Sequence, residues 1–374
     1  STGFCLSMRI LQVLPALNSG GVERGTVDFA REIVKMGHES IVLSSGGRMV
    51  KDLEASGTRH ITLPVHRKAL ASLKMVGPVR RLLEELKPDI VHVRSRLPAW
   101  IVWLAWKGMP KATRPRLIST FHGLYSVNFY SAIMAKSERV IAISQTVHDY
   151  ICANYRVNPA KLTLIHRGVD DSEFAPGEAD AQWLDAFLQE YPAAKGKKII
   201  LMPGRLSRWK GQSEFLDVMS KIVAQRQDCH GIVVGGADPD KAHYVEELKQ
   251  KARALKLESH VTFVGHRSDI PQFYRLADIV CHLSTKPEPF GRTLTEALAC
   301  GDKVVAYDRG GATESLSACF PEGLVPPDDV DGFARKVLSL LGQARSITLK
   351  PEFLLANQVD ATLNVYQQAL ASPR

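Results

Sequence analysis

Cysteine pairs and long apolar runs are the features that this sequence most clearly lacks. The six cysteines are scattered over 374 residues, and no two of them form a CxxC motif. This spacing argues against a disulfide framework or a zinc site and favours reduced thiols in a cytosolic protein. The longest apolar run, Ala99–Trp106, is far shorter than the ~20 residues that cross a bilayer. Residues 1–7 lack the charge and apolar run of a signal peptide, so we expect no targeting segment and only peripheral membrane contact.

A dinucleotide-binding signature is also missing. A dinucleotide-dependent oxidoreductase needs G-x-G-x-x-G, and neither half of the chain contains it; the stretch GGVERG that starts at Gly20 has a different spacing. Asp-x-Asp spacing occurs at Asp238-Pro239-Asp240 and Asp329-Val330-Asp331, but neither pair argues for a bound metal, so we expect no metal site.

Negative charge is scarce in the first part of the chain. Residues 1–168 contain 24 Lys and Arg against 11 Asp and Glu, whereas the remainder contains 24 against 28. The first part therefore carries +13 and the second −4. This asymmetry points the first part towards an anionic partner, which is a nucleic acid, a membrane surface or an acidic acceptor.

Short apolar strands alternate with helical patterns in two series. The chain is long enough for two domains, and its alternation predicts open, mostly parallel α/β sheets. The predicted strands are Met8–Leu14, Ser40–Ser44, Ile61–Leu63, Ile90–Val93, Arg116–Thr120 and Val140–Ile143 in the first series, and Ile199–Met202, Gly231–Gly236, Val261–Val264 and Lys303–Tyr307 in the second. Ligands of such sheets bind beyond the carboxyl ends of the strands.

The stretch Ser284–Gly301 places two carboxylates on either side of a strand-to-helix turn. Two prolines keep the approach extended, and apolar residues at helical spacing predict a helix that begins near Gly291. The N–H groups of its first turn favour a phosphate, while Glu288 and Glu296 can accept hydrogen bonds from hydroxyls. A solvated acidic turn on a surface helix is the alternative.

EPFGRTLTE with the following ALACG resembles the Glu-x7-Glu signature of retaining glycosyltransferases of the family 4 type, which have the GT-B fold. The resemblance runs from Gly20 to the last helix. It implies that Glu288 contacts the donor sugar, that Glu296 holds the ribose, and that the donor is a nucleoside diphosphate sugar, with a UDP-sugar favoured and no cofactor. The turn is assigned to the same donor site through Phe290, Gly291, Arg292, Thr293 and Leu294.

Two further turns complete the expected donor site. Gly204-Arg205 with Lys210-Gly211 resembles the family's Gly-Arg…Lys-Gly clamp, which neutralises the leaving diphosphate. A basic surface turn is the alternative. Gly235 lies at the end of the next predicted strand, and the resemblance implies that the turn with His266 and Arg267 faces the nucleobase.

Strand ends of the first series supply the remaining candidates. The resemblance places Gly20 and Gly21 beside the donor phosphate, and the His122 of STFHG at the donor sugar, where a structural histidine is the alternative. With His122, the implied catalytic residues are Glu288, Arg205 and Lys210. Arg94 and Arg96 suit a phosphorylated acceptor unless they are merely solvated. Arg167 stands where the family usually has Asn.

A basic cluster follows in the segment from Lys68 to Arg116, which has 11 Lys and Arg and three acids. Trp100, Trp103 and Trp106 recur three apart in it. They form either a core-facing stripe or part of a membrane-adsorbing surface. RSRLPAW with STFHGLY also resembles proteobacterial transferases that build surface polysaccharide.

These observations predict a GT-B protein with two Rossmann-like domains, whose mostly parallel sheets face a cleft. The expected domains are 8–172, completed by a crossing helix 358–374, and 199–357, with 173–198 as a linker. The expected function is retaining, metal-independent sugar transfer to a glycolipid or lipopolysaccharide-core acceptor, at the cytoplasmic face of a bacterial inner membrane and without nucleic acid. A noncatalytic nucleic-acid- or nucleotide-binding protein, an oxidoreductase and a sugar phosphorylase are the alternatives.

Overall fold

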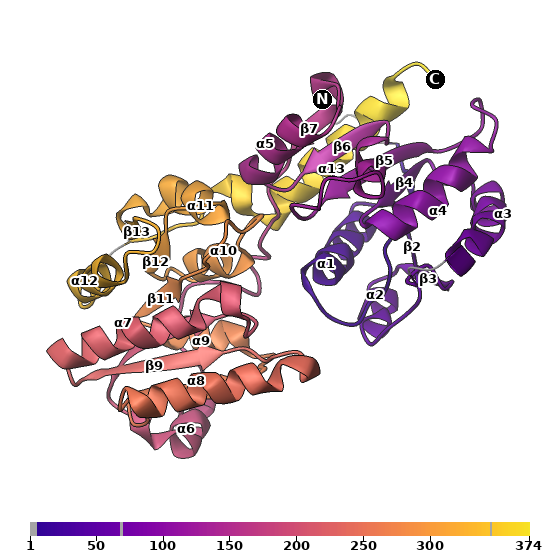
Figure 1. The fold of residues 1–374 in the computed structure, drawn as a ribbon. Coiled ribbons are helices and arrows are strands. Elements are labelled where there is room, and N and C mark those ends of the chain that lie inside the picture. The colour runs from indigo at the N-terminus through magenta and orange to yellow at the C-terminus, as the bar shows by residue number, and fades with distance from the viewer. Residues whose placement is uncertain (1–5, 68–69, 345) are drawn as a thin grey trace. The chain divides into compact units, whose positions relative to one another are not determined.

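The computed structural model describes residues 6–67, 70–344 and 346–374. The chain divides into two compact units (Figure 1). Unit 1 consists of Ser1–Gly168 and Leu355–Arg374, and unit 2 of Val169–Leu354.

Unit 1 contains a seven-stranded sheet in which every pairing is parallel. Its strands, in spatial order, are β3 (Arg59–Thr62), β2 (Glu39–Ser44), β1 (Arg9–Val13), β4 (Ile90–Val93), β5 (Arg116–Phe121), β6 (Arg139–Ala142) and β7 (Leu162–Leu164). The central strands are buried along almost their whole length, which is why they read as continuous apolar runs in the sequence.

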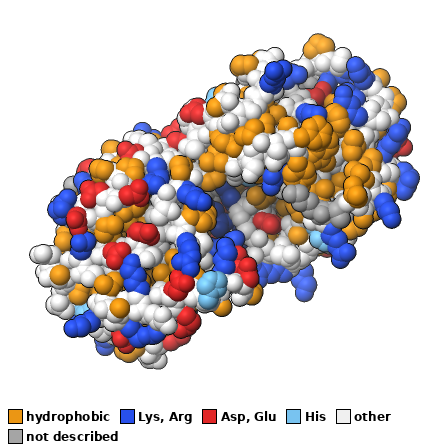
Figure 2. Space-filling model, viewed as in Figure 1, with side chains coloured by type: hydrophobic (Ala, Val, Ile, Leu, Met, Phe, Trp, Pro, Cys, Tyr) orange, Lys and Arg blue, Asp and Glu red, His pale blue; other side chains and the backbone are white. Residues whose placement is uncertain are grey.

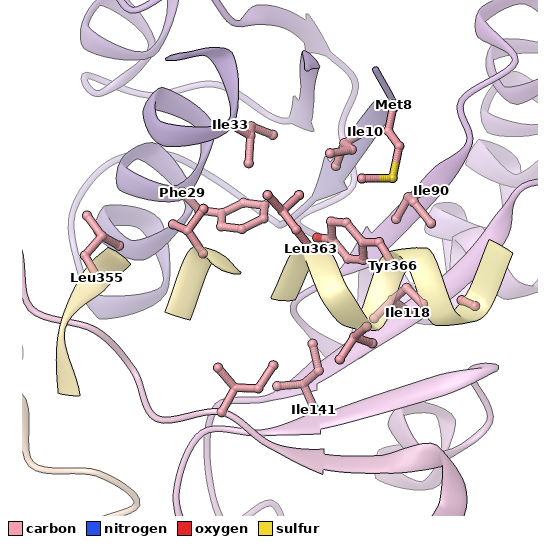
Figure 3. Packing of buried hydrophobic residues seen from close by; sticks show 14 residues of the cluster. Met8, Ile10, Phe29, Ile33, Ile90, Ile118, Ile141, Leu355, Leu363 and Tyr366 are labelled. Carbon is pink, nitrogen blue, oxygen red and sulfur yellow. The ribbon is translucent and has the colours of Figure 1, made fainter. Parts of the chain in front are cut away.

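The helices of unit 1 include one from the far end of the chain. They are α1 (Gly21–Lys35), α2 (Val50–Ala55), α3 (Val76–Leu86), α4 (Arg96–Lys107), α5 (Gln145–Asn154) and α13 (Leu355–Ala371), with the 3-10 turns η1 (Leu70–Met75), η2 (Ser131–Ala135) and η3 (Pro159–Lys161). Figure 3 shows α13 placing Leu363 and Tyr366 among Phe29 of α1 and the strand residues Ile10 and Ile118. The last helix is thus part of the core of unit 1.

Unit 2 contains a six-stranded sheet that is also parallel throughout. Its strands are β10 (Val261–Gly265), β9 (Cys229–Val234), β8 (Lys198–Pro203), β11 (Ile279–His282), β12 (Val304–Tyr307) and β13 (Leu324–Val325). Its helices are α6 (Ala181–Glu190), α7 (Gln212–Gln225), α8 (Ala242–Ala254), α9 (Ile270–Leu276), α10 (Arg292–Ala299), α11 (Gly311–Cys319) and α12 (Val330–Leu340), with η4 (Pro192–Ala194), η5 (Arg208–Lys210), η6 (Pro239–Lys241), η7 (Pro321–Gly323) and η8 (Pro351–Phe353).

The segment 173–198, whose composition predicts a linker, contains helix α6. Asp180 caps this helix by accepting hydrogen bonds from the N–H groups of Gln182 and Trp183. The Trp183 ring packs edge-on against Phe273 at 5.1 Å, and its Nε1 donates to Asp269 at 2.7 Å. This packing ties α6 to α9 and explains why the segment groups with unit 2.

Two parallel sheets with helices between their strands confirm the predicted architecture of two Rossmann-like domains. Among the residues that the structure describes, no helix is long and apolar enough to cross a membrane.

Candidate functional site

The centre of the candidate site in unit 2 is an ion pair between Lys210 and Glu288. Lys210 Nζ lies 2.7 Å from Glu288 Oε1, and the Glu288 side chain is only 8% exposed. The same oxygen accepts a hydrogen bond from Ser284 Oγ at 2.7 Å and lies 3.2 Å from His282 Nε2. Burial alone would raise the pKa of Glu288, but the positive charge and hydrogen bonds of His282 and Lys210 outweigh it and hold that pKa well below its usual range. Glu288 is therefore a buried carboxylate that stays ionised.

Close backbone contacts hold the loop of Glu288 in place. The N–H of Gly311 donates to the Glu288 carbonyl at 2.9 Å, and a Cβ at Gly311 would lie 1.9 Å from the Phe290 carbonyl oxygen. Gly211 has a φ of +86°, and a Cβ there would lie 2.0 Å from the carbonyl oxygen of Leu283. Only glycine permits these approaches, which bring the loops after β8, β11 and β12 together.

A similar contact joins the first two loops of unit 2. A Cβ at Gly235, where φ is +149°, would lie 1.8 Å from the carbonyl oxygen of Gly204. The predicted residues Gly204 and Gly235 therefore meet at the ends of β8 and β9.

Helix α10 begins as the sequence predicts. Gly291 is its N-cap residue with a φ of +83°, a left-handed conformation that suits glycine, and the first helical residue is Arg292. Phe290 and Leu294 are buried, whereas Arg292 is exposed and Thr293 is half-buried. The first-turn N–H groups thus start directly after the loop that carries Glu288.

Glu296 lies on the half-buried face of α10. Tyr274 donates from its hydroxyl to Glu296 Oε1 at 3.4 Å. Burial, and then the Glu296 charge, raise the pKa of Tyr274 well above its ordinary value, so the phenol keeps its proton. No local pattern points to Tyr274, because this residue lies 22 residues before its partner in the chain.

The other predicted donor residues of unit 2 differ in their surroundings. The Arg205 side chain is 64% exposed and lies 3.9 Å from Asp238, which belongs to an Asp-Pro-Asp sequence. His266 is exposed. Arg267 makes a two-pronged hydrogen bond with Asp269, at 3.0 and 2.7 Å, and that bond lowers the pKa of Asp269 to about 2. Arg267 thus stabilises the turn to which it belongs.

In unit 1 the candidate site surrounds the first turn of α1. Gly20 caps this helix with a φ of +131°. The guanidinium of Arg167 lies against the backbone of the turn, since a Cβ at Gly21 would come within 2.5 Å of its Nη1. The position where this chain departs from the family's Asn therefore places a cation at the N-terminus of α1.

Arg94, which is buried, and His122, which is half-buried, are close enough to interact electrostatically, and His122 also interacts with Arg167. Arg94 is 4% exposed, donates from Nε to Gln12 at 2.8 Å, and has no carboxylate partner among the described residues. His122 Nε2 is buried and has no hydrogen-bond partner in the described part of the chain. Burial, followed by the charges of Arg94 and Arg167, lowers the pKa of His122 well below its ordinary value. This imidazole is therefore neutral, and the region favours an anion.

Arg96, unlike Arg94, packs against aromatic rings. Its guanidinium lies 4.8 Å from the Tyr125 ring and 5.1 Å from the Tyr130 ring, and Nη1 donates to Ser131 at 3.0 Å. These contacts hold the loop before η2, so they give Arg96 a structural task in addition to the predicted one.

Two of the three tryptophans of α4 belong to a mixed aromatic surface. Trp106 is buried and donates to the Pro115 carbonyl, as a core stripe predicts. Trp100 and Trp103 are half-buried, and the ammonium of Lys136 lies 5.6 and 4.9 Å from their rings. Lys68, the first residue of the predicted basic cluster, lies outside the described residues.

Comparison with known proteins agrees with this geometry. The model for glycosyltransferase family 4 matches residues 19–173, and that for glycosyl transferases group 1 matches residues 185–347. A crystal structure of a glycosyltransferase from Rickettsia africae ESF-5 is 31% identical, covers 98% of this chain and 100% of that one, and superposes with a TM-score of 0.87. The chain belongs to the glycosyltransferases.

More distant relatives of this glycosyltransferase differ in what they act on. A phosphatidyl-myo-inositol mannosyltransferase from Mycolicibacterium smegmatis is 27% identical over 339 residues, which is 86% of this chain and 81% of that protein. The Anabaena protein HepE, solved with UDP and glucose, is 23% identical over 96% of this chain and 98% of that one, with a TM-score of 0.73, and it shares the fold. The comparisons favour neither a nucleic-acid-binding protein nor an oxidoreductase.

Proposed function

We propose that this glycosyltransferase moves a sugar from a nucleoside diphosphate sugar, with a UDP-sugar favoured, to an anionic glycolipid or polysaccharide acceptor. The observation that carries the proposal is the Lys210–Glu288 pair directly before the N-terminus of α10. It combines a cation for a diphosphate, helix N–H groups for its oxygens, and an ionised carboxylate for a sugar hydroxyl. HepE, solved with UDP and glucose, supports the donor class by analogy.

The donor is held as follows. Lys210 and Arg205 bind the diphosphate together with the first-turn N–H groups of α10. Glu296 accepts hydrogen bonds from the ribose, and its Tyr274 contact orients it. The turn with His266 lies beside the base. The neutral His122 of unit 1 is assigned to the donor sugar by family resemblance.

Bond cleavage leaves a nucleoside diphosphate, whose developing charge must be neutralised. Lys210, Arg205 and the α10 amides supply positive charge and donors for this, so the proposed transfer needs no divalent ion. We assign the retaining course, in which the acceptor attacks from the face that the leaving phosphate vacates. Its support is the family resemblance of the Glu-x7-Glu motif.

An anionic acceptor fits unit 1. Arg94 is a buried guanidinium without a described carboxylate partner, and the half-buried guanidinium of Arg167 lies at the start of α1. Guanidinium groups suit phosphate because their planar fork can donate two hydrogen bonds to it. The similarity to a phosphatidyl-myo-inositol mannosyltransferase and to WaaG, a glycosyltransferase of lipopolysaccharide biosynthesis (16% identity, TM-score 0.66), is in line with a lipid-linked acceptor.

The surface of unit 1 supports the proposal that the protein attaches peripherally to an anionic membrane. All large hydrophobic side chains that the described chain exposes belong to this unit: Leu6, Met36, Leu70, Leu73, Val127, Phe129 and Leu370. Figure 2 shows hydrophobic side chains gathered over the region of α4. Phe129, 75% exposed, packs on Trp100 with Lys136 5.5 Å from its ring. Aromatic rings beside lysines suit the interface of an anionic bilayer, here the inner face of a bacterial inner membrane.

A panel of nucleotide sugars tests the donor and the mechanism. The correct donor at ~100 times its dissociation constant should stabilise the protein by about 2.7 kcal/mol, which a thermal shift detects. Proton NMR of the transferred sugar should show the anomeric configuration of the donor, with turnover unchanged by EDTA.

Lys210→Ala and Arg205→Ala should each cut turnover by roughly 10², the scale of one lost transition-state donor. Turnover within about twofold of wild type in both variants would contradict the assignment.

A further inference from the structure

Glu288 gathers its polar contacts on one oxygen. Lys210, Ser284 and His282 all approach Oε1, at 2.7, 2.7 and 3.2 Å. They come from three places in the chain: η5, the loop after β11, and the last residue of β11. His282 is 8% exposed and Ser284 is 2% exposed, so both contacts with Glu288 lie in the protein interior.

Two negatively charged groups compete for the ammonium of Lys210. In this structure it neutralises Glu288, while the proposed function requires it at the donor diphosphate. A buried carboxylate that loses its ammonium partner is strongly destabilised unless other donors compensate for it. His282 and Ser284 already contact the same oxygen, so they can take over this task without a rearrangement of Glu288.

We propose that His282 and Ser284 are positioning residues for Glu288. They keep this carboxylate ionised and oriented while the Lys210 ammonium leaves its ion pair with Glu288 and forms one with the donor diphosphate. The inference rests on the proposed donor class. It makes Glu288 a competitor of the diphosphate for Lys210, so a free nucleoside diphosphate must pull Lys210 away from Glu288 in order to bind. His282 lowers the cost of that exchange by stabilising the carboxylate that is left behind.

The exchange predicts effects of opposite sign. Glu288→Gln removes the competing charge and should tighten binding of the free nucleoside diphosphate by roughly tenfold, the factor that corresponds to 1.4 kcal/mol. His282→Gln should weaken the same binding by roughly fivefold, because Glu288 then depends more on Lys210. Ser284→Ala removes a donor to the same oxygen and should change affinity in the same direction as His282→Gln.

A double-mutant cycle separates this role from a merely structural one. Calorimetry is performed with UDP, GDP and ADP on wild type, on both single variants and on the combination of His282→Gln with Glu288→Gln. If His282 acts through Glu288, His282→Gln should change affinity by less than about twofold in the Glu288→Gln background. The matched control is His230→Gln, which alters another buried histidine of unit 2, one at the start of β9 that bonds to Thr262 at 2.7 Å.

Each outcome decides between the explanations. An unchanged affinity in both His282→Gln and Ser284→Ala overturns the exchange while leaving the donor class intact. A loss that persists in the Glu288→Gln background, or that His230→Gln reproduces, assigns His282 to structure and also overturns it. If Lys210→Ala leaves nucleotide binding unchanged, or if wild type binds none of the three nucleotides, the proposed function itself is wrong. The proposed exchange of Lys210 between Glu288 and the diphosphate is then wrong as well.

Discussion

Glu288 and Glu296 differ in their surroundings, and this difference predicts separate roles. Glu296 is half-buried beside Tyr274, whereas Glu288 is buried and ion-paired. Glu296→Ala should weaken the binding of free nucleotide and intact donor alike, because the ribose is present in both. Glu288→Ala should reduce sugar transfer without weakening the free nucleotide. Calorimetry with both ligands checks this, and equal losses for both ligands in both variants would refute it.

His230 predicts how stability depends on pH. Burial, reinforced by the nearby His260, lowers the pKa of His230 from 6.5 to about 4. Between these values the unfolded chain takes up a proton that the folded chain does not, so stability is full above pH 6.5 and falls as the pH drops towards 4. The loss attributable to this histidine is up to about 3 kcal/mol. Urea unfolding of wild type and His230→Gln at pH 7 and 4.5 should show a smaller acid loss in the variant; parallel losses would contradict the assignment.

At the scale of elements, the start of α11 is held to the Glu288 loop by a contact that admits no side chain. A Cβ on Gly311 would lie 1.9 Å from the Phe290 carbonyl oxygen. Gly311→Ala should therefore destabilise unit 2 and weaken donor binding, although alanine favours a helix by about 1 kcal/mol. Gly77→Ala in α3 is the matched control, since its Cβ would make only ordinary van der Waals contact with Arg81 Nη1, at 3.6 Å, among the described residues outside its own helix backbone. Thermal unfolding should shift down for Gly311→Ala and should change far less for Gly77→Ala, where the Cβ meets the ring of Pro78 and offsets the helix preference of alanine. An unfolding temperature of Gly311→Ala at or above that of wild type would contradict this prediction.

The elements also show how far sequence reasoning reaches. Strands β1, β4, β8 and β12 were predictable because parallel strands buried on both faces read as apolar runs. The short strands β7 and β13, with three and two residues, carry no periodicity of their own, and pairing with longer neighbours defines them. The start of α10 was predictable from its local turn chemistry.

The site was less accessible to the same reasoning. Two separate motifs pointed to Glu288 and to Lys210, but the contact between these residues spans 78 residues and depends on how the loops pack. His282, Ser284 and Tyr274 have no local signature, and the Gly310-Gly311 pair became meaningful only through its contact with the Glu288 loop. The assigned roles of the site residues remain predictions.

At the scale of the whole molecule, charge and exposed apolar surface both concentrate in unit 1. Its residues 1–168 carry the +13 balance, and Phe129 projects beside Lys136. The protein should therefore sediment with vesicles that contain anionic lipid and should dissociate as salt rises, because screening acts over ~8 Å at ~0.15 M. Phe129→Ser should weaken this binding, and so should charge reversal at the basic positions Arg80, Arg81 and Lys87.

The vesicle experiment needs a control for lost hydrophobicity. Met36→Ser removes another exposed apolar side chain of unit 1, at the C-terminus of α1 and 51% exposed, and should leave vesicle binding unchanged. Equal sedimentation with neutral and anionic vesicles, or equal losses from Phe129→Ser and Met36→Ser, would refute a specific membrane-facing surface.

The position of α13 bears on how the chain is made. Unit 2 is continuous in sequence, whereas unit 1 resumes only at Leu355. A ribosome adds ~5–20 residues per second, so roughly 10–40 s separate the synthesis of Gly168 from that of α13. During this interval Phe29, Ile33 and the strands of unit 1 have no Leu363 or Tyr366 to pack against. Unit 2 is complete first, and the earlier half of the nascent chain needs protection from aggregation until α13 has been made.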